Sequence, residues 1–310
     1  MKSLLLTLLL LPILLQANGM PPEETAPYSD TSMSIRHAVL LGVVEGVTEF
    51  LPVSSTGHLL LAERVLKISG DPHTERAVDS YMIIIQMGAI LAVAWVYHGY
   101  IKRMILGLLG KDTDGRRLFL NILIAFVPAA IVGILFVDVI KERLFDLWMV
   151  SFAWLVGGMA LVIWGRKSPE ASLQETCTLE NMTGRQALLI GALQVVAMLP
   201  GTSRSLVTIL GGKWAGLSLR NSVIFSFLLG LVTLSASTLY DFTLNGAEMI
   251  NILGAQSLII GLLTAYFSAW IAVKGMVRYL KNHGMGLFGG YRIALAMVTA
   301  GLLLGGWISP

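Results

Sequence analysis

Long apolar runs constrain this chain more than any other feature of its sequence. Several of them approach the ~20 residues that an α-helix needs to cross the ~30 Å hydrocarbon core of a bilayer. The composition agrees, because 55% of the 310 residues are hydrophobic and only 13% are charged. Soluble domains typically carry about 25% charged residues. The sequence therefore predicts an all-α, polytopic membrane protein.

The charge and the cysteine content exclude other classes of protein. The net charge is only +3, and no run of Lys and Arg stands out, so we expect no nucleic-acid partner. The single cysteine, Cys177, cannot form a disulfide framework or a multi-cysteine metal cluster within the chain. Redox chemistry is therefore not expected.

The N-terminal residues are typical of a targeting segment. Residues 1–17 combine Lys2, an apolar stretch and the small Ala17, which predicts a cleavable signal peptide. An uncleaved anchor is the alternative. Residues 18–33 are rich in proline and acidic residues, which predicts a flexible extracytoplasmic lead-in. A single membrane domain is expected to occupy residues 34–310.

Six apolar segments are predicted to be transmembrane helices, because each approaches the length and hydropathy of a membrane span. They are residues 81–97, 118–137, 147–164, 222–240, 253–273 and 287–307.

Two further apolar regions are interrupted by proline. Residues 35–66 are broken at Pro52, and residues 186–214 are broken at Pro200. Because proline removes a helical hydrogen bond and Ser or Thr caps helix starts, each region should be a helix, a turn and a second helix. Each half is too short to cross the membrane, so we predict two re-entrant broken-helix hairpins. Such backbone is tolerated at membrane depth only beside protein or a wet cavity, which marks the breaks as a candidate site.

The basic residues favour one orientation in the membrane. With the chain starting outside, cytoplasmic loops receive 14 of the 22 Lys and Arg residues. In this count Arg292 is a cytoplasmic loop residue, and residues 241–251 form a periplasmic loop without positive charge. Residues 34–165 and 186–310 then each contain one hairpin and three spans, so they are predicted to form an inverted-topology repeat.

The first hairpin carries reactive side chains on both sides of its break. Glu45 and Glu49 are four residues apart and share a helix face. They could bind a divalent cation together, or one could act as a base. After the break, Ser54, Ser55 and Thr56 occupy a helix start, where free N–H groups suit an anion such as phosphate.

A possible nucleophile and proton carrier follow from the spacing after the break. His58 comes three residues after Ser55 and is expected on the same helix face. The second hairpin offers another helix start rich in Ser and Thr, with Arg204, whose planar guanidinium matches phosphate oxygens.

Each of these residues also has a purely structural interpretation. Hydroxyls in membrane helices usually bond to the backbone or to a neighbouring helix. His58 could be a structural hydrogen-bonding residue, and Arg204 could pair with Glu45 or Glu49 for stability. Their joint occurrence at the two interruptions favours a reactive site.

The two motifs resemble those of a known family. Glu45-x-x-x-Glu49 followed by LPVSSTGHL, together with PGTSRSLVT after residue 199, resembles the two signature motifs of the bacitracin-resistance (BacA/UppP) family of undecaprenyl-diphosphate phosphatases. The resemblance extends from about residue 35 to the C-terminus. The signal-like extension departs from the family pattern, as do Leu206 and Val207, where small residues are common.

The resemblance implies an enzyme of the bacterial inner membrane with its active site open to the periplasm. It would hydrolyse undecaprenyl diphosphate to undecaprenyl phosphate and inorganic phosphate, recycling the carrier for envelope polymers and conferring bacitracin resistance. It implies a divalent cation, Mg²⁺ or Ca²⁺. The polyprenyl diphosphate and membrane lipids are the expected partners, and a homodimer is the assembly considered. Expected site residues are catalytic Glu49, Ser55, His58 and Arg204, substrate-binding Ser54, Thr56, Ser203, Ser205 and Thr208, and metal-binding Glu45 and Glu49.

Two questions stay open from the sequence. Ser55 is the preferred nucleophile, with Glu49 or His58 handling its proton, but attack by metal-bound water is the mechanistic alternative. A transporter or flippase for a polyprenyl phosphate lipid is the alternative function, because many transporters combine inverted repeats with broken helices.

Overall fold

The chain folds into a helical bundle. The computed structural model describes residues 1–3, 5–7, 33–68, 71–164 and 178–309, without the side chains of residues 137–144, and the regular structure in this part of the chain is entirely helical. Within the described residues, six helices are long and apolar enough to cross a membrane, which confirms the six predicted spans. They are α4 (Pro72–Val96), α6 (Thr113–Leu144), α7 (Leu147–Trp164), α10 (Leu219–Leu253), α11 (Ala255–Leu280) and α12 (Gly286–Leu304). The predicted signal peptide and lead-in lie largely outside the described residues.

Both interrupted regions have the predicted order of helix, break and helix. The first contains α2 (Ile35–Thr48) and α3 (Ser55–Leu66). The second contains α8 (Gly184–Gln194), the short 3₁₀ helix η1 (Val195–Met198) and α9 (Arg204–Trp214).

The helices after the two breaks begin in the same unusual way. Their N-caps, Ser54 and Ser203, have φ of 72° and 76° and accept hydrogen bonds from the backbone N–H groups of Gly57 and Leu206. Positive φ is uncommon for residues other than glycine, and such strain concentrates at functional sites. Among the described residues, Lys67 is the one other non-glycine residue with positive φ.

Two predicted loops are wrong in part. Residues 241–251 were expected to form a loop, but they continue α10, which ends only before Gly254 at a φ of 85°. The side-chain amide of Asn245 donates to Asp241 one turn earlier, at 2.9 Å, and this contact stabilises the polar end of the helix. Between the predicted spans 81–97 and 118–137, the chain forms α5 (His98–Leu108), which was not predicted because it is too short to appear as a span.

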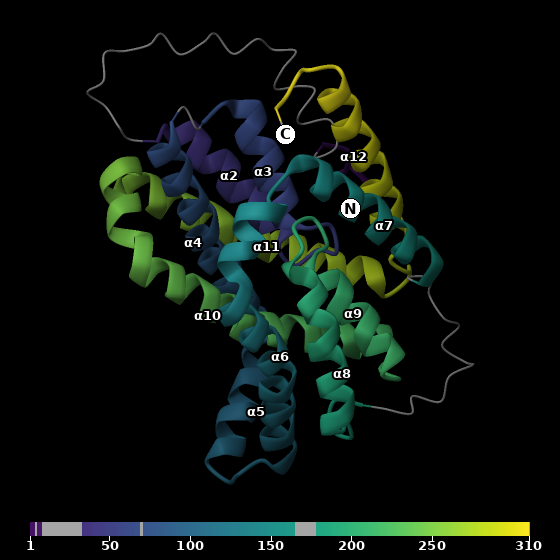
Figure 1. Ribbon diagram of the computed structural model, residues 1–310. Helices are drawn as coiled ribbons and strands as arrows, with labels where there is room; N and C mark the ends of the chain where they lie inside the picture. Colours follow the sequence, from purple (N-terminus) through teal and green to yellow (C-terminus); the bar gives the residue numbers. More distant parts are fainter. Residues whose placement is uncertain (4, 8–32, 69–70, 165–177, 310) are drawn as a thin grey trace.

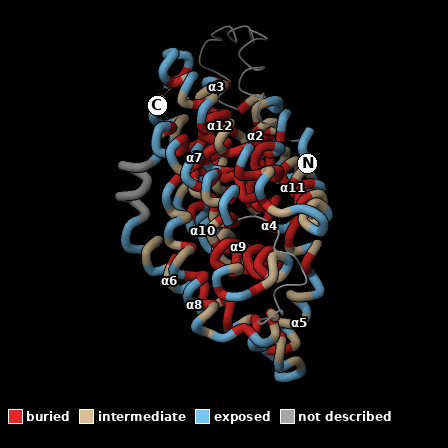
Figure 2. Tube along the Cα trace, turned by 90° about the vertical axis from the view of Figure 1, so that its right-hand side faces the viewer, coloured by how far each residue is buried: buried red, intermediate tan, exposed pale blue. Residues whose placement is uncertain are grey.

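Most of the helix pairs that pack side by side are far apart in sequence. α11 packs along α2 and α4, α12 along α7, α10 against α4 and α9, and α6 against α5 and α8 (Figure 1). Small residues allow close approach in the membrane: a Cβ at Gly46 of α2 would overlap the backbone of α11 at Ala265. Buried residues gather along the centre of the bundle (Figure 2).

The charge count generates a prediction about topology. Lys111 and Glu248 are exposed at opposite ends of the predicted orientation, cytoplasmic and periplasmic. In a Cys177→Ala background, we expect Glu248→Cys, but not Lys111→Cys, to react with a membrane-impermeant thiol reagent on intact cells. Both should react after permeabilisation. Labelling of Lys111→Cys alone on intact cells would overturn the orientation.

Candidate active site

The two breaks meet inside the bundle. The Ser205 hydroxyl donates to the carbonyl oxygen of Leu51 at 2.7 Å, across 154 residues of sequence. Beside this contact, Nη2 of Arg204 lies 3.4 Å from Oε1 of Glu49. The second broken region thus places Arg204 and Ser205 against Glu49 and Leu51 of the first, and the ion pair is the contact that the purely structural interpretation of Arg204 expected.

A hydroxyl and a carboxylate face each other across the first break. Glu49 caps the C-terminus of α2 and Ser55 is the first residue of α3, so the break returns Ser55 to Glu49. The Ser55 hydroxyl donates directly to Oε2 of Glu49. Both residues are buried. This arrangement gives Ser55 a proton acceptor, as an activated nucleophile requires.

The guanidinium of Arg204 is held in place by several contacts, but one of its donors has no hydrogen-bond partner among the described residues. Its Nη1 donates to the carbonyl of Ser226 at 2.9 Å, and its Cζ lies 5.3 Å from the centre of the Phe50 ring. It also lies against Gly230, where any Cβ would overlap it. Its Nε is buried and has no hydrogen-bond partner among the described residues. One charged donor is therefore left for an anion.

Both ring nitrogens of His58 hydrogen-bond to groups other than the Ser55 hydroxyl. Its Nδ1 lies 2.6 Å from the carbonyl oxygen of Ser54, and its Nε2 lies 2.6 Å from the hydroxyl of Tyr291. Since a carbonyl only accepts, Nδ1 carries a proton, and in the corresponding neutral tautomer Nε2 accepts from the Tyr291 hydroxyl. The three-residue spacing thus puts both residues on α3, but it is Glu49 that contacts the Ser55 hydroxyl.

Glu45 is the second carboxylate of the site. It is 1% exposed, and its Oε1 has no hydrogen-bond partner among the described residues. An unpaired buried carboxylate oxygen fits a hard cation such as Mg²⁺ or Ca²⁺. No group of three or more His, Cys, Asp or Glu side chains in the described part of the chain could hold a metal. Mg²⁺ often uses one or two carboxylates and takes its other ligands from substrate phosphates and water.

The remaining predicted residues mostly order the breaks. Ser54 and Ser203 cap helices, and Ser203 and Ser205 share a hydrogen bond of 3.0 Å. The Thr208 hydroxyl pairs with that of Ser226 at 2.6 Å. Thr56 is exposed.

Arg292 donates hydrogen bonds to backbone carbonyls of both breaks. The charge count predicted a wrong position for it. It was assigned to a cytoplasmic loop, but it lies in α12 with 0% exposure. It donates to the carbonyl oxygens of Gly201 at 2.9 Å and Ala153 at 2.8 Å, and it reaches those of Pro52 and Trp154 at 3.4 Å. Broken backbone leaves carbonyls without helical partners, and a buried guanidinium can satisfy several of them.

The sequence does contain a signal that could have identified Tyr291 and Arg292 as site residues. They are adjacent polar residues inside the predicted span 287–307, where an ionisable side chain calls for a functional interpretation.

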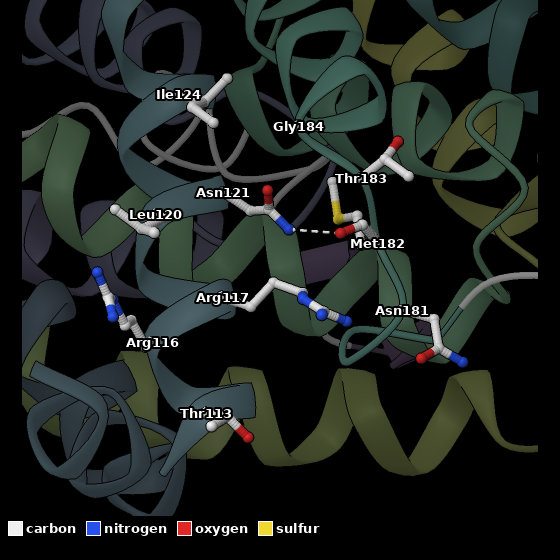
Figure 3. Close-up of a pocket in the computed structure, with 10 residues that line it drawn as sticks. All are labelled: Thr113, Arg116, Arg117, Leu120, Asn121, Ile124, Asn181, Met182, Thr183 and Gly184. Atoms are coloured by element: carbon white, nitrogen blue, oxygen red, sulfur yellow. Dashed lines mark hydrogen bonds between the residues drawn. The ribbon is translucent and has the colours of Figure 1, made fainter. Parts of the chain in front are cut away.

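A surface cavity lies elsewhere in the bundle. It has a volume of about 650 Å³ and is lined by residues near the starts of α6 and α8, including Arg116, Arg117 and Asn121 (Figure 3). The side-chain amide of Asn121 donates to the carbonyl of Met182 at its wall, at 2.8 Å. None of the residues described above at the two breaks lines this cavity. It is therefore separate from the candidate active site.

The fold and the site together define a class of membrane protein. A serine hydroxyl on a carboxylate, next to a buried arginine with a free donor, suits a membrane-embedded enzyme that acts on a phosphate group. The chain belongs to the BacA family: the family model described as bacitracin resistance protein BacA matches residues 38–298.

Curated proteins are similar to this one along most of its length. The "Undecaprenyl-diphosphatase" of Nitrosospira multiformis is 39% identical, over 84% of this chain and 92% of the relative. That of Methylococcus capsulatus is 41% identical, over 85% and 93%. The "Undecaprenyl-diphosphatase 2" of Rhodospirillum rubrum is 39% identical, over 88% and 96%.

The contacts of Arg292 predict a large effect on stability. Arg292→Met should lower the melting temperature of the purified protein by roughly 5 °C or more, because several buried carbonyls lose a charged donor. Arg64→Met is the matched control, since Arg64 makes one partly exposed ion pair of 3.5 Å with Glu75, and such pairs contribute about 1 kcal/mol or less. Equal melting temperatures for the two variants would contradict the role of Arg292.

Proposed function

We propose that this protein hydrolyses undecaprenyl diphosphate to undecaprenyl phosphate and inorganic phosphate. The observation that carries the proposal is the contact of Ser55 with Glu49 beside Arg204. The names of the relatives supply the substrate. This activity recycles the lipid carrier for cell-envelope polymers and accounts for bacitracin resistance in the family.

In the first chemical step, the Ser55 oxygen attacks the terminal phosphorus. Its proton passes to Glu49, and the bond between that phosphorus and the bridging oxygen breaks, so undecaprenyl phosphate leaves with the electron pair. Charge on the phosphoryl oxygens is neutralised by Arg204, whose free Nε is buried where little water competes. The product of this step is a phosphoserine.

In the second step, water attacks the phosphorus of the phosphoserine. Glu49 passes its proton back to the Ser55 oxygen as the P–O bond breaks. The water supplies the new oxygen of inorganic phosphate, and its two protons leave with that phosphate. His58 orders the start of α3 through Ser54 and Tyr291 in this scheme. Hydrogen-bond geometry thus favours Glu49 over His58 as the base for Ser55.

The proposal includes a divalent cation, Mg²⁺ or Ca²⁺. Glu45 would hold it through its unpaired Oε1, with Glu49 as the second carboxylate. When bound, the cation would neutralise charge on the diphosphate.

Two re-entrant hairpins in an inverted-topology repeat are part of the same proposal. The packing of the helices supports it. The first helices of the two hairpins, α2 and α8, each pack on a span of the other repeat, α11 and α6 respectively. The other spans pack in pairs across the two repeats, α4 with α10 and α7 with α12. Such pairs are expected if residues 34–165 and 186–310 are related by a two-fold axis in the membrane plane. The matching backbone of Ser54 and Ser203 supports the same relation.

We place this multi-pass protein in the bacterial inner membrane, with its site open to the periplasm. The orientation follows from the distribution of basic residues. The polyprenyl chain would extend between helices into the surrounding lipids. A homodimer stays a prediction.

A transporter or flippase is the less favoured function. Arg204 and capping hydroxyls would suffice to hold an anion for transport. A carrier has no need for a serine hydroxyl hydrogen-bonded to a buried carboxylate, as Ser55 is to Glu49.

Substitutions at Ser55 and Arg204 should separate chemistry from binding. Ser55→Ala should lower phosphate release from undecaprenyl diphosphate by about 10³-fold or more while still binding the lipid. Arg204→Lys should weaken binding and lower release by about 10²-fold, because a point charge does not reproduce a planar fork. Release and lipid binding are measured separately on purified protein. Near-normal release by Ser55→Ala would favour water attack, and absence of release by the wild-type protein would refute the proposed function.

Removal of divalent cations should inactivate the enzyme. Excess chelator is expected to lower phosphate release by about tenfold or more, and Mg²⁺ or Ca²⁺ should restore it. Glu45→Gln should raise the cation concentration needed for half-maximal release. Glu75→Gln makes the same charge change at a partly exposed residue outside the site and should behave as wild type. Full wild-type activity in chelator would remove the cation and leave Glu49 as a base alone.

A further inference from the structure

A buried glutamine beside the active site has a free donor. Gln194 ends α8 and is 2% exposed. Its Oε1 accepts from the hydroxyl of Thr233 at 3.3 Å, but its Nε2 has no hydrogen-bond partner among the described residues. Most buried polar atoms are paired, because an unpaired donor in apolar surroundings is costly. The free amide therefore points to an acceptor that binds there.

Gln194 and Arg204 both contact α10. The guanidinium of Arg204 bonds to the carbonyl of Ser226 and lies against Gly230, and Thr233 follows Gly230 by three residues. Residues three apart share a helix face and are separated by about 4.5 Å along the axis. Gln194 and Arg204 thus pack on the same face of α10, about one turn apart.

The charges around this place suit an anion. Nε of Arg204 and Nε2 of Gln194 are both unpaired donors. Residues 184–214, which contain both, include no Asp or Glu, whereas the first broken region carries Glu45 and Glu49 before its proline. An acceptor between Gln194 and Arg204 would therefore meet two donors from the second region, while the carboxylate of Glu49, 3.4 Å from Arg204, comes from the first.

We propose that the Gln194 amide donates a hydrogen bond to a phosphoryl oxygen of the diphosphate, beside Arg204. Gln194 is then a substrate-binding residue contributed by the second broken region. This inference rests on the proposed function, since the diphosphate is the anion expected there.

Binding and kinetics of substituted proteins test the assignment. The binding probe is methylenediphosphonate, a diphosphate analogue that resists hydrolysis. Gln194→Met keeps the shape of the side chain without its donor and should weaken probe binding about 10- to 100-fold. The KM for undecaprenyl diphosphate should rise by a similar factor, with little change in kcat. This is the pattern expected when a variant loses a contact that is equally strong in the ground state and the transition state. Gln194→Glu, which has the same shape, should weaken binding at least as much, and it replaces the Met variant if that does not fold.

A second buried glutamine is the matched control. Gln86 in α4 already donates to the Thr238 hydroxyl at 2.7 Å, so Gln86→Met should leave probe binding and KM unchanged. Binding by the Gln194 variants within twofold of wild type would overturn the proposal, as would equal losses in Gln86→Met. Probe binding that depends on Gln194, in a wild-type protein that releases no phosphate, would refute the proposed function but keep Gln194 as an anion ligand.

Discussion

The structure depends on satisfying backbone groups where two helices are broken inside an apolar bundle. A free carbonyl or N–H is costly without water, so irregular backbone persists there only with protein partners. Arg292 supplies donors to both breaks, and the Trp154 indole donates to the carbonyl of Val53 at 2.9 Å. Ser205 joins the second break to the first. The reactive side chains can be held at depth because these contacts hold the chain that carries them.

A second set of contacts, among the side chains of the candidate site, supports the proposed chemistry. Opposite charges on Glu49 and Arg204 lie within 3.4 Å, and the Ser55 hydroxyl completes the group. Burial makes each of these interactions stronger than it would be in water and also makes every unpaired atom informative. Three of the buried unpaired atoms, those of Glu45, Arg204 and Gln194, are of complementary kinds. Glu45 offers an acceptor on the side of the first break, whereas Arg204 and Gln194 offer donors on the side of the second.

Local features of the sequence predicted most of the fold. Spans follow from the length of apolar runs, and both breaks follow from proline with Ser or Thr, so these elements needed no tertiary information. The orientation of His58 toward Tyr291, across 233 residues, could not be predicted, because spacing on one helix says nothing about a partner on another. Arg292 was misjudged for the same reason: a positive charge was counted as a loop residue when its partners were carbonyls of distant breaks.

The length of α10 links the site to the bilayer. Its 35 residues extend about 50 Å, well beyond the ~30 Å of hydrocarbon, so the helix must either lean or project into the aqueous phase. A helix that leans adjusts its tilt to the thickness of the surrounding lipid. Gly230, on which the Arg204 guanidinium lies, is part of that helix. The thickness of the bilayer therefore acts on the helix against which the Arg204 guanidinium, the proposed phosphate ligand, is packed.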